Sequence, residues 1–322
     1  MRIFYDDDAD TSVLDGQQIA VVGYGNQGRS WALNLRDSGA APIVCVRRDA
    51  SRDEAERDGF EAHELEAAND ADVLCILVPD DVIPLLPLRP RNTALTIVAS
   101  GYTLAFDRLA IEGDLGMVAP RMLGPLVREC YVEGAGFITA VGVHRDVTGT
   151  AEARMLAVAK AIGGLREGGM ELTAMQEALL DLAVEQVLSP ALAAVNNAFV
   201  ATMLAHDIPL EAVITELVLS GEVERTYGLL REVGYAVQSE YHSPTSQYGQ
   251  LSRRGQYDHL DVRSKMEELT ADIESGRFAD EWDAERDDGY PRLNALKEQH
   301  AGPGVREFEA ELRRRLGPGA RK

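Results

Sequence analysis

Cysteine, tryptophan and positive charge are scarce in this sequence. Its 322 residues include three cysteines and two tryptophans, and 32 lysines and arginines stand against 53 acidic residues, for a formal net charge of −21. Cys45, Cys75 and Cys130 lack the spacing of a metal site, and the first two lie in apolar runs, which predicts core thiols and a reducing compartment. Because so negative a chain repels a phosphate backbone, we expect no nucleic-acid partner.

Two further features are missing. The amino terminus has no signal-peptide pattern, and we find no apolar run long enough to cross a bilayer. These absences predict a cytoplasmic protein without a membrane partner. A length of 322 residues predicts two domains.

The most informative stretch of the chain is Ile19–Gly39. It begins with an apolar run, passes through the turn GYGNQG and continues as a helix-compatible segment, which is the strand–GxGxxG–helix order of a dinucleotide-binding site. Gly23 permits a sharp turn, Gly25 lets the backbone approach a pyrophosphate, and Gly28 lets the helix pack closely on the strand. The alternative is a purely structural turn. The candidate cofactor contacts here are Gly23, Tyr24, Gly25, Asn26, Gln27 and Gly28.

Further short apolar runs alternate with helix-compatible segments, and each ends in a polar or glycine-containing turn. This order predicts an open parallel α/β sheet of the Rossmann type. Because ligands of such sheets bind beyond the carboxyl ends of the strands, the turns after the strands should converge. The expected strands after Ile19–Val22 are Pro42–Val46, Asp72–Val78, Ala94–Ala99, Leu115–Val118 and Phe137–Val143. Their turns add Pro79, Asp80, Ser100, Gly101 and Gly124 to the candidate cofactor contacts.

From about Gly169 the pattern becomes helical. We expect a dinucleotide-binding domain over residues 1–168 and an all-helical domain over residues 169–322. Residues 178–204 are so rich in alanine, leucine and valine that the helix they predict needs burial against other helices or a second copy of the chain. The tail from Gly317 is expected to be disordered.

The residues after the second expected strand bear on the choice of cofactor. A carboxylate at this place holds the ribose hydroxyls of NAD, whereas Arg47, Arg48, Ser51 and Arg52 offer groups that suit a 2′-phosphate. We therefore favour NADPH, with NADH as the alternative. The alternative role of these residues is a solvated arginine loop, because aspartates at positions 49 and 53 weaken the positive field.

A candidate metal site lies in the helical half. Asp181 and Glu185 are four residues apart in an otherwise apolar stretch, so a helix places both carboxylates on one face. Two acids on an apolar helix are costly unless they are paired or bind a cation, and Mg²⁺ is commonly held by one or two carboxylates with water and substrate oxygens. The alternative is that the two acids form the exposed stripe of the helix.

The chain resembles the ketol-acid reductoisomerase family over nearly its whole length, and its length resembles the short, class I form. The resemblance implies a Rossmann domain and an all-helical, knotted domain, which pair as dimers with sites at the interface and use NAD(P)H and two Mg²⁺. It also implies conversion of an acetohydroxy acid to a dihydroxy acid by alkyl migration and ketone reduction. The segments that carry the resemblance are GYGNQG, Val78-Pro79-Asp80, Val118-Ala119-Pro120, Leu126-Val127-Arg128, Ile162-Gly163-Gly164 and Asp181-Leu182-x-x-Glu185-Gln186.

Several departures from the family pattern fall on catalytic positions. Ser100-Gly101-Tyr102-Thr103 stands where the family has His-Gly-Phe-Asn, and Arg121 replaces a lysine, which matters because arginine stays charged. By resemblance, Asp181 and Glu185 are the first pair of metal ligands, and Ser243 is a serine that contacts substrate. The family's second pair, two glutamates four residues apart from the partner subunit, is incomplete here. If Glu216 is the first member of the pair, Ser220 stands four residues later where the second glutamate belongs. If Glu222 is the second member, Val218 stands four residues earlier where the first belongs.

We therefore expect an NADPH-dependent oxidoreductase of this family that reduces a keto- or imino-acid-like substrate without the full two-metal isomerisation. It would use one Mg²⁺, two or none. The candidate catalytic residues are Arg121, Asp181, Glu185 and Ser243, with Arg121 either a clamp for a substrate carboxylate, a phosphate contact or a surface salt bridge. One alternative is a true ketol-acid reductoisomerase of branched-chain amino-acid biosynthesis. Another is a non-redox cyclase or isomerase of a specialised pathway. In each case we expect a small-molecule substrate and a homodimer or higher homo-oligomer.

Overall fold

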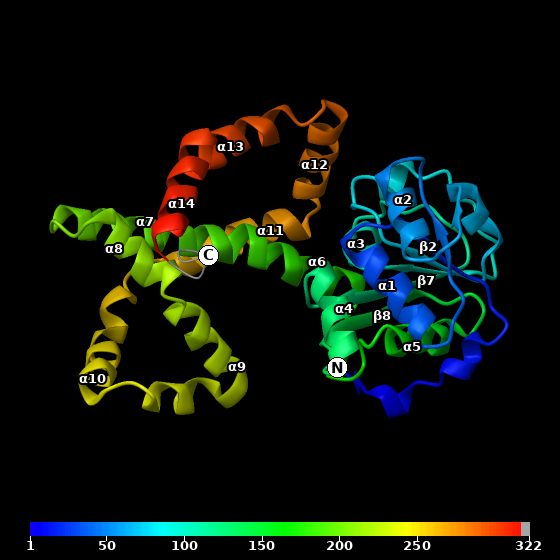
Figure 1. Ribbon diagram of the computed structural model, residues 1–322, viewed down its shortest axis with the longest axis horizontal. Coiled ribbons are helices and arrows are strands. Elements are labelled where there is room, and N and C mark those ends of the chain that lie inside the picture. Colours follow the sequence, from blue (N-terminus) through cyan, green and yellow to red (C-terminus); the bar gives the residue numbers. More distant parts are fainter. Residues whose placement is uncertain (317–322) are drawn as a thin grey trace. The chain divides into compact units, whose positions relative to one another are not determined.

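The structure, a computed structural model, describes residues 1–316, so the tail from Gly317 that was expected to be disordered lies outside the described residues. The chain forms two compact units, Met1–Leu182 and a second that begins at Ala183 (Figure 1). Residues just after 168 still form a strand of the sheet, and the expected domain boundary after residue 168 stays a prediction.

The first unit is built around a nine-stranded sheet with the order β1-β9-β8-β7-β6-β5-β2-β3-β4. The strands from β7 to β4 in this order all run parallel, which confirms the predicted parallel sheet. β8 runs antiparallel to β7, and β1 pairs antiparallel with β9. The strands are β1 (Ile3–Phe4), β2 (Ile19–Val22), β3 (Ile43–Cys45), β4 (Ala62–His63), β5 (Val73–Ile76), β6 (Leu95–Val98), β7 (Asp114–Pro120), β8 (Thr139–Arg145) and β9 (Gly169–Glu171).

Alternate side chains of the central strands enter two hydrophobic cores. In β2, Ile19 and Val21 belong to one core and Ala20 and Val22 to the other, as the two-residue period of a strand requires. Every residue of β2, β5 and β6 is buried, which explains why short uninterrupted apolar runs predicted these strands. The helices of this unit are α1 (Asn26–Asp37), α2 (Ala50–Arg57), α3 (Tyr102–Ala105), α4 (Gly124–Glu133), α5 (Ala151–Ala161) and α6 (Ala174–Ala183).

Two of the three cysteines lie in these cores. Cys45 and Cys75 are buried, as their apolar surroundings in the sequence predicted, and burial raises the pKa of each thiol to about 12. Neither thiol is therefore a reactive nucleophile at neutral pH.

The edges of the sheet were not predicted from the sequence. The residues before Ile19 contribute strand β1, which pairs with β9, and β4 extends the opposite edge beside β3. These strands are two or three residues long and carry no periodic pattern. The β1 edge is held by Arg2, whose guanidinium forms an ion pair with Glu171 at 2.6 Å.

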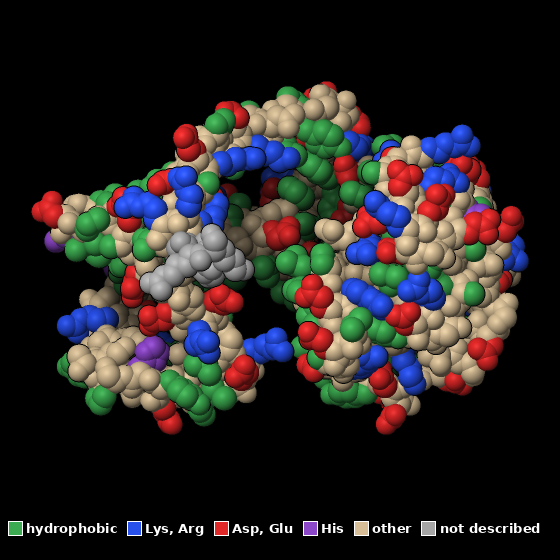
Figure 2. Space-filling view, viewed as in Figure 1, with side chains coloured by type: hydrophobic (Ala, Val, Ile, Leu, Met, Phe, Trp, Pro, Cys, Tyr) green, Lys and Arg blue, Asp and Glu red, His purple; other side chains and the backbone are tan. Residues whose placement is uncertain are grey.

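The second unit is helical, in agreement with the predicted helical domain, while a knotted path of its chain stays a prediction. Only six side chains of residues 183–316 are buried: Val187, Val213, Gln238, Ile273, Ala279 and Leu312. Figure 2 shows hydrophobic side chains on the surface of this unit. Its elements are η5 (Val184–Leu188), α7 (Ser189–Ala205), α8 (Leu210–Ile214), η6 (Thr215–Leu219), α9 (Glu222–Glu240), α10 (Pro244–Arg253), η7 (Arg254–Tyr257), α11 (Val262–Glu274), α12 (Arg277–Asp287), α13 (Pro291–Ala301) and α14 (Pro303–Arg315).

One helical run corrects an expectation. Ala174–Ala205 is long and apolar enough to cross a membrane by length and composition alone, although we expected no such stretch. The run continues through Pro190 because the π-helical turn η5 precedes the proline, and the Ser189 hydroxyl donates to the carbonyl of Val184 at 2.9 Å. A core helix of an oligomer has the same composition, so the run does not by itself indicate a membrane protein.

Candidate functional site

The site is built at the point where the strand order reverses. β2 lies between β3, which leads to β4, and β5, which leads through β6 to β7. A cavity of about 500 Å³ lies beyond the carboxyl ends of these strands, as expected for a dinucleotide-binding sheet. Three of the predicted turns meet there. They contribute Gly23, Tyr24, Gly25, Arg47, Asp49, Ser51, Val78 and Pro79 to its lining.

The three glycines of the first turn are needed for different reasons. Gly23 has a φ of +96°, and a methyl group on it would lie 2.6 Å from Cγ1 of Val78. A methyl group on Gly28 would lie 2.2 Å from the carbonyl oxygen of Gly23. The fold therefore demands both residues. A methyl group on Gly25 would meet nothing within 4 Å, so the absence of a side chain there leaves open space, which fits a bound pyrophosphate.

The other residues of the turn hold it in place. The hydroxyl of Tyr24 donates to Asp58 at 2.9 Å, and its buried ring packs edge-on against Phe60. Burial raises the pKa of Tyr24, so its hydroxyl stays protonated at neutral pH and keeps donating to Asp58. The Gln27 side chain accepts from the indole N–H of Trp31, and Asn26 begins α1. These side chains support the backbone that faces the cavity.

Gly124 has a similar supporting role. A methyl group on it would lie 2.6 Å from the carbonyl carbon of Asn26, so this glycine lets the start of α4 pack on the start of α1. Its carbonyl also accepts a hydrogen bond from the buried hydroxyl of Ser30 at 2.8 Å.

The arginine loop is only partly directed at the cavity. Arg47 and Ser51 line it, together with Asp49, whose carboxylate caps α2 by accepting from the backbone N–H of Ser51 at 2.9 Å. Arg48 and Arg52 instead both donate to Glu64. The structure therefore brings two of the four predicted phosphate ligands to the cavity and places the other two beside it.

The remaining predicted turns lie at the same edge of the sheet. Pro79 and Asp80 lie three and four residues after the end of β5, and Asp80 is partly buried. The hydroxyl of Ser100 accepts from the N–H of Tyr102 at 3.1 Å and so stabilises the start of α3. A methyl group on Gly101 would lie 2.3 Å from the carbonyl oxygen of Ala174, so this turn requires a glycine where it meets α6.

Arg121, at the end of β7, is held by two carboxylates of α6. Its Nη1 donates to Glu177 at 2.6 Å and its Nη2 donates to Asp181 at 2.7 Å. Glu177 is 1 % exposed and accepts a further hydrogen bond from the N–H of Gly101 at 2.6 Å. Burial raises the pKa of Glu177, and the charge of Asp181 adds to this, although the bonds from Gly101 and Arg121 oppose it.

Glu177 is a site residue that the sequence analysis missed. It precedes Asp181 by four residues, the same helical spacing that drew attention to Glu185. The signal was therefore present, but its role depends on Arg121, which is distant in sequence. With both outer nitrogens of Arg121 engaged by α6, its guanidinium is less available as a clamp for a substrate carboxylate.

The other predicted ligands lie in the second unit. Glu185 is in the π-helical turn η5, Glu216 is in the π-helical turn η6, and Glu222 begins α9. Ser220 donates to the carbonyl of Glu216 at 3.3 Å. Ser243 is the N-terminal cap of α10 and accepts from the N–H of Ser246 at 3.3 Å.

These acids do not form a complete magnesium site on one chain. Within residues 1–316, no three His, Cys, Asp or Glu side chains are grouped so that they could hold a metal ion. Asp181 is already paired with a fixed guanidinium, which opposes a second cation beside it. A Mg²⁺ ion at Asp181 would therefore have to compete with Arg121 for this carboxylate.

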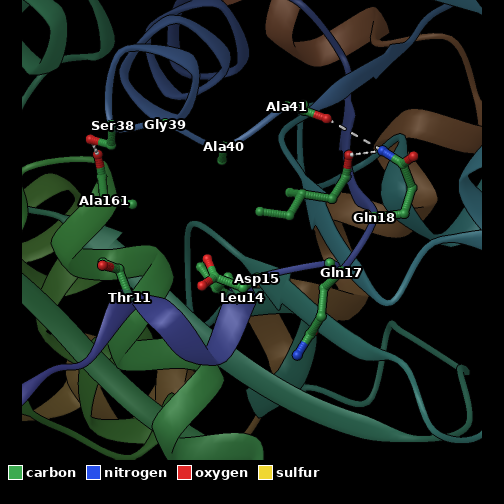
Figure 3. A pocket seen from close by; sticks show the side chains of 12 residues that line it. Thr11, Leu14, Asp15, Gln17, Gln18, Ser38, Gly39, Ala40, Ala41 and Ala161 are labelled. Atoms are coloured by element: carbon green, nitrogen blue, oxygen red, sulfur yellow. Dashed lines mark hydrogen bonds between the residues drawn. The ribbon is translucent and has the colours of Figure 1, made fainter.

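A second cavity, of about 390 Å³, lies on the side of the sheet where the amino end of β2 begins and α1 ends, away from the carboxyl ends of the strands (Figure 3). The side chain of Gln18 donates to the carbonyls of Ile19 and Ala41, and the hydroxyl of Ser38 donates to the carbonyl of Ala161. These groups already have partners in the protein, and the amino edge of such a sheet is not where ligands bind.

Comparisons with known proteins agree with this geometry. Residues 13–168 match the family model "Acetohydroxy acid isomeroreductase, NADPH-binding domain", and residues 175–317 match "Ketol-acid reductoisomerase, C-terminal domain". A ketol-acid reductoisomerase (NADP(+)) from Methanocaldococcus jannaschii is 35% identical over 327 residues, which cover 98% of each chain.

Solved structures give the same result. An NADH-preferring ketol-acid reductoisomerase from an uncultured archaeon has a TM-score of 0.89 and 31% identity, covering 98% of this chain and 99% of that one. A putative oxidoreductase from Jannaschia sp. CCS1 has a TM-score of 0.57 and 15% identity, covering 81% and 97%, and shares the fold alone. With both family models matched in order along one chain, this protein belongs to the ketol-acid reductoisomerase family.

Proposed function

We propose that this chain is a ketol-acid reductoisomerase, which uses NADPH to convert an acetohydroxy acid to a dihydroxy acid. The observation that carries the proposal is the match to both family domains over nearly the full chain. The open space at Gly25 and the cavity beside it support a dinucleotide cofactor. Arg47 and Ser51 in that cavity support NADPH, and NADH is the alternative because a similar structure prefers it.

We further propose that the active form is a homodimer or larger homo-oligomer in the cytoplasm. α7 is strongly apolar, yet none of its residues is buried in the single chain. A second copy would cover this helix and could supply Glu216 or Glu222 to complete a Mg²⁺ site with Asp181 and Glu185. The number of ions, one, two or none, stays a prediction.

A second candidate function is reduction without alkyl migration. It is favoured by the ion pair of Asp181 with Arg121 at 2.7 Å, because this carboxylate is the expected first metal ligand. It is also favoured by Ser220, which follows Glu216 by four residues in place of an acid. Alkyl migration depends on cations that polarise neighbouring oxygens, whereas hydride transfer needs a bound nicotinamide and an oriented acceptor.

The test compares two substrates of the full-length protein with NADPH and Mg²⁺. Acetolactate must undergo both alkyl migration and reduction to give the dihydroxy acid. The hydroxy-keto acid formed by that migration needs the reduction alone. NADPH oxidation is followed by absorbance, and the dihydroxy acid is identified by mass spectrometry. The Gly25→Ala variant, in which we expect weaker NADPH binding, is the control: oxidation that depends on bound cofactor should fall in it.

Turnover of both substrates supports the proposed function. Turnover of the hydroxy-keto acid alone supports the second candidate and contradicts the first. If neither substrate oxidises NADPH although the cofactor binds, both candidates are wrong, and the expected alternative of a non-redox cyclase or isomerase becomes the next hypothesis.

A further inference from the structure

A single carboxylate holds two arginines at the edge of the proposed cofactor site. Oε1 of Glu64 accepts from Nε of Arg48 at 3.0 Å and from Nη1 of Arg52 at 2.9 Å. Nη2 of Arg52 also donates to the carbonyl of Ala62 at 2.6 Å. Glu64 directly follows β4, so the edge strand of the sheet places it opposite the loop after β3.

This cluster adjoins the switch-point cavity. Arg48, Asp49, Arg52, Asp53 and Glu64 line a shallow hollow of about 500 Å³. Asp49 lines both this hollow and the cavity that contains Gly23 and Gly25. In a sheet of this type the adenosine ribose of a dinucleotide lies at the end of the second strand of the fold, here β3. The hollow therefore lies next to the position of the ribose 2′ substituent.

The charges in the hollow compete with one another. Two arginines stand against three carboxylates, so the hollow has no net positive charge to offer. A phosphate monoester carries a charge of about −1.5 to −2 at neutral pH and binds guanidinium groups through charge-assisted hydrogen bonds. Arg48, whose side chain is 81 % exposed, donates to Glu64 through Nε, so a phosphate that binds Arg48 has to share this guanidinium with the carboxylate.

We propose that Glu64 is a selectivity-determining residue, which competes with the adenosine 2′-phosphate for Arg48 and Arg52 and so narrows the preference for NADPH over NADH. This inference rests on the cofactor of the proposed function, but not on its substrate or reaction. The partners of Glu64 are both cations of the loop, and its side chain makes no cap for the following 3₁₀ turn. Among the described residues, Arg48 and Arg52 are thus the printed hydrogen-bond donors to its carboxylate, while its backbone carbonyl accepts from the N–H of Ala67.

The test measures dissociation constants of the full-length chain by isothermal titration calorimetry for NADPH, NADH, 2′-AMP and 5′-AMP. The variant is Glu64→Gln, which keeps the shape of the side chain and removes its charge. The matched control is Glu66→Gln, which removes the same charge from an exposed glutamate two residues away. We expect Glu64→Gln to tighten binding of NADPH and 2′-AMP by about three- to tenfold, with NADH and 5′-AMP unchanged.

Three results would overturn the proposal. Equal tightening by Glu64→Gln and Glu66→Gln means that overall charge, not this carboxylate, governs binding. Weaker NADPH binding to Glu64→Gln means that Glu64 presents the arginines to the phosphate instead of withholding them. Unchanged affinities mean that the arginines do not reach the phosphate. Tighter NADPH binding without turnover of any keto acid supports this inference while the proposed function fails.

Discussion

The carboxylate of Glu177 accepts a hydrogen bond from Nη1 of Arg121 at 2.6 Å, which ties the end of β7 to α6. The other oxygen of Glu177 accepts from the N–H of Gly101, so the turn after β6 joins the same group. Asp181, one helical turn later, accepts from Nη2 of Arg121 at 2.7 Å. The orientation of this guanidinium is therefore fixed by the fold before any substrate binds.

Removal of the Glu177 carboxylate should destabilise the first unit. Glu177→Ala leaves the N–H of Gly101 and one side of Arg121 without their partner. Breaking a buried pair costs about 3–5 kcal/mol, and because Arg121 is 24 % exposed we expect a loss of about 2–3 kcal/mol in the free energy of unfolding. Urea unfolding followed by tryptophan fluorescence measures this. The exposed control Glu66→Ala should change stability by less than about 0.5 kcal/mol, and equal stability of the two variants would contradict the prediction.

The stability contributed by Glu177 should also depend on pH. Its pKa is raised by burial, so the folded protein holds this proton more tightly than the unfolded chain does. Above the ordinary glutamate pKa of 4.5, the unfolded state binds fewer protons, and the contribution of Glu177 to stability falls as pH rises toward the raised value. Glu177→Gln removes this titration. The free energy of unfolding of the variant minus that of the wild type should therefore increase from pH 4.5 toward neutrality. A constant or decreasing difference would show that the pKa is not raised.

Two alanine variants in the glycine-rich turn should separate cofactor binding from folding. Gly25→Ala meets no neighbouring atom, so we expect unchanged urea unfolding but NADPH binding weakened by at least about tenfold, because the methyl group blocks the pyrophosphate. Gly28→Ala would lie 2.2 Å from the carbonyl of Gly23, and we expect a loss of about 1–3 kcal/mol in stability. Calorimetric titration with NADPH and urea unfolding of both variants check this pair. Unchanged NADPH affinity of Gly25→Ala would mean that the cofactor does not approach this residue.

Local patterns in the sequence were sufficient to predict the centre of the first unit. The run Ile19–Val22 with its glycine turn predicted β2 and the start of α1. It also predicted that the cavity lies beyond the carboxyl ends of the strands. These features depend on residues within a few positions of one another, because a buried strand must be apolar throughout and a tight turn needs glycine. The edge strand β4 could not be predicted in the same way, since two residues carry no period.

The contacts between charged side chains at the candidate site could not be predicted from local patterns. Arg121 meets Asp181 across 60 residues of sequence, and Gly101 meets Glu177 across 76. Arg48 and Arg52 were expected to face a phosphate, yet Glu64 engages both. In each case the charge of a residue was visible in the sequence, but its partner was set by the order of strands in the sheet.

The proposed oligomer predicts that one charge on α7 disrupts assembly. Val195 is 66 % exposed in the single chain, on a helix of which no residue is buried. If a second copy covers this helix, Val195→Asp places a carboxylate in an apolar interface without a partner, which is costly, and the dimer should dissociate. Val132 on α4 is also 66 % exposed, so Val132→Asp makes the same chemical change at a matched exposure and should leave assembly unchanged. Sedimentation velocity of the wild type and both variants measures the outcome. A monomeric wild type would contradict the oligomer, whereas dissociation by both variants, or by neither, would show that α7 is not the surface that holds the copies together.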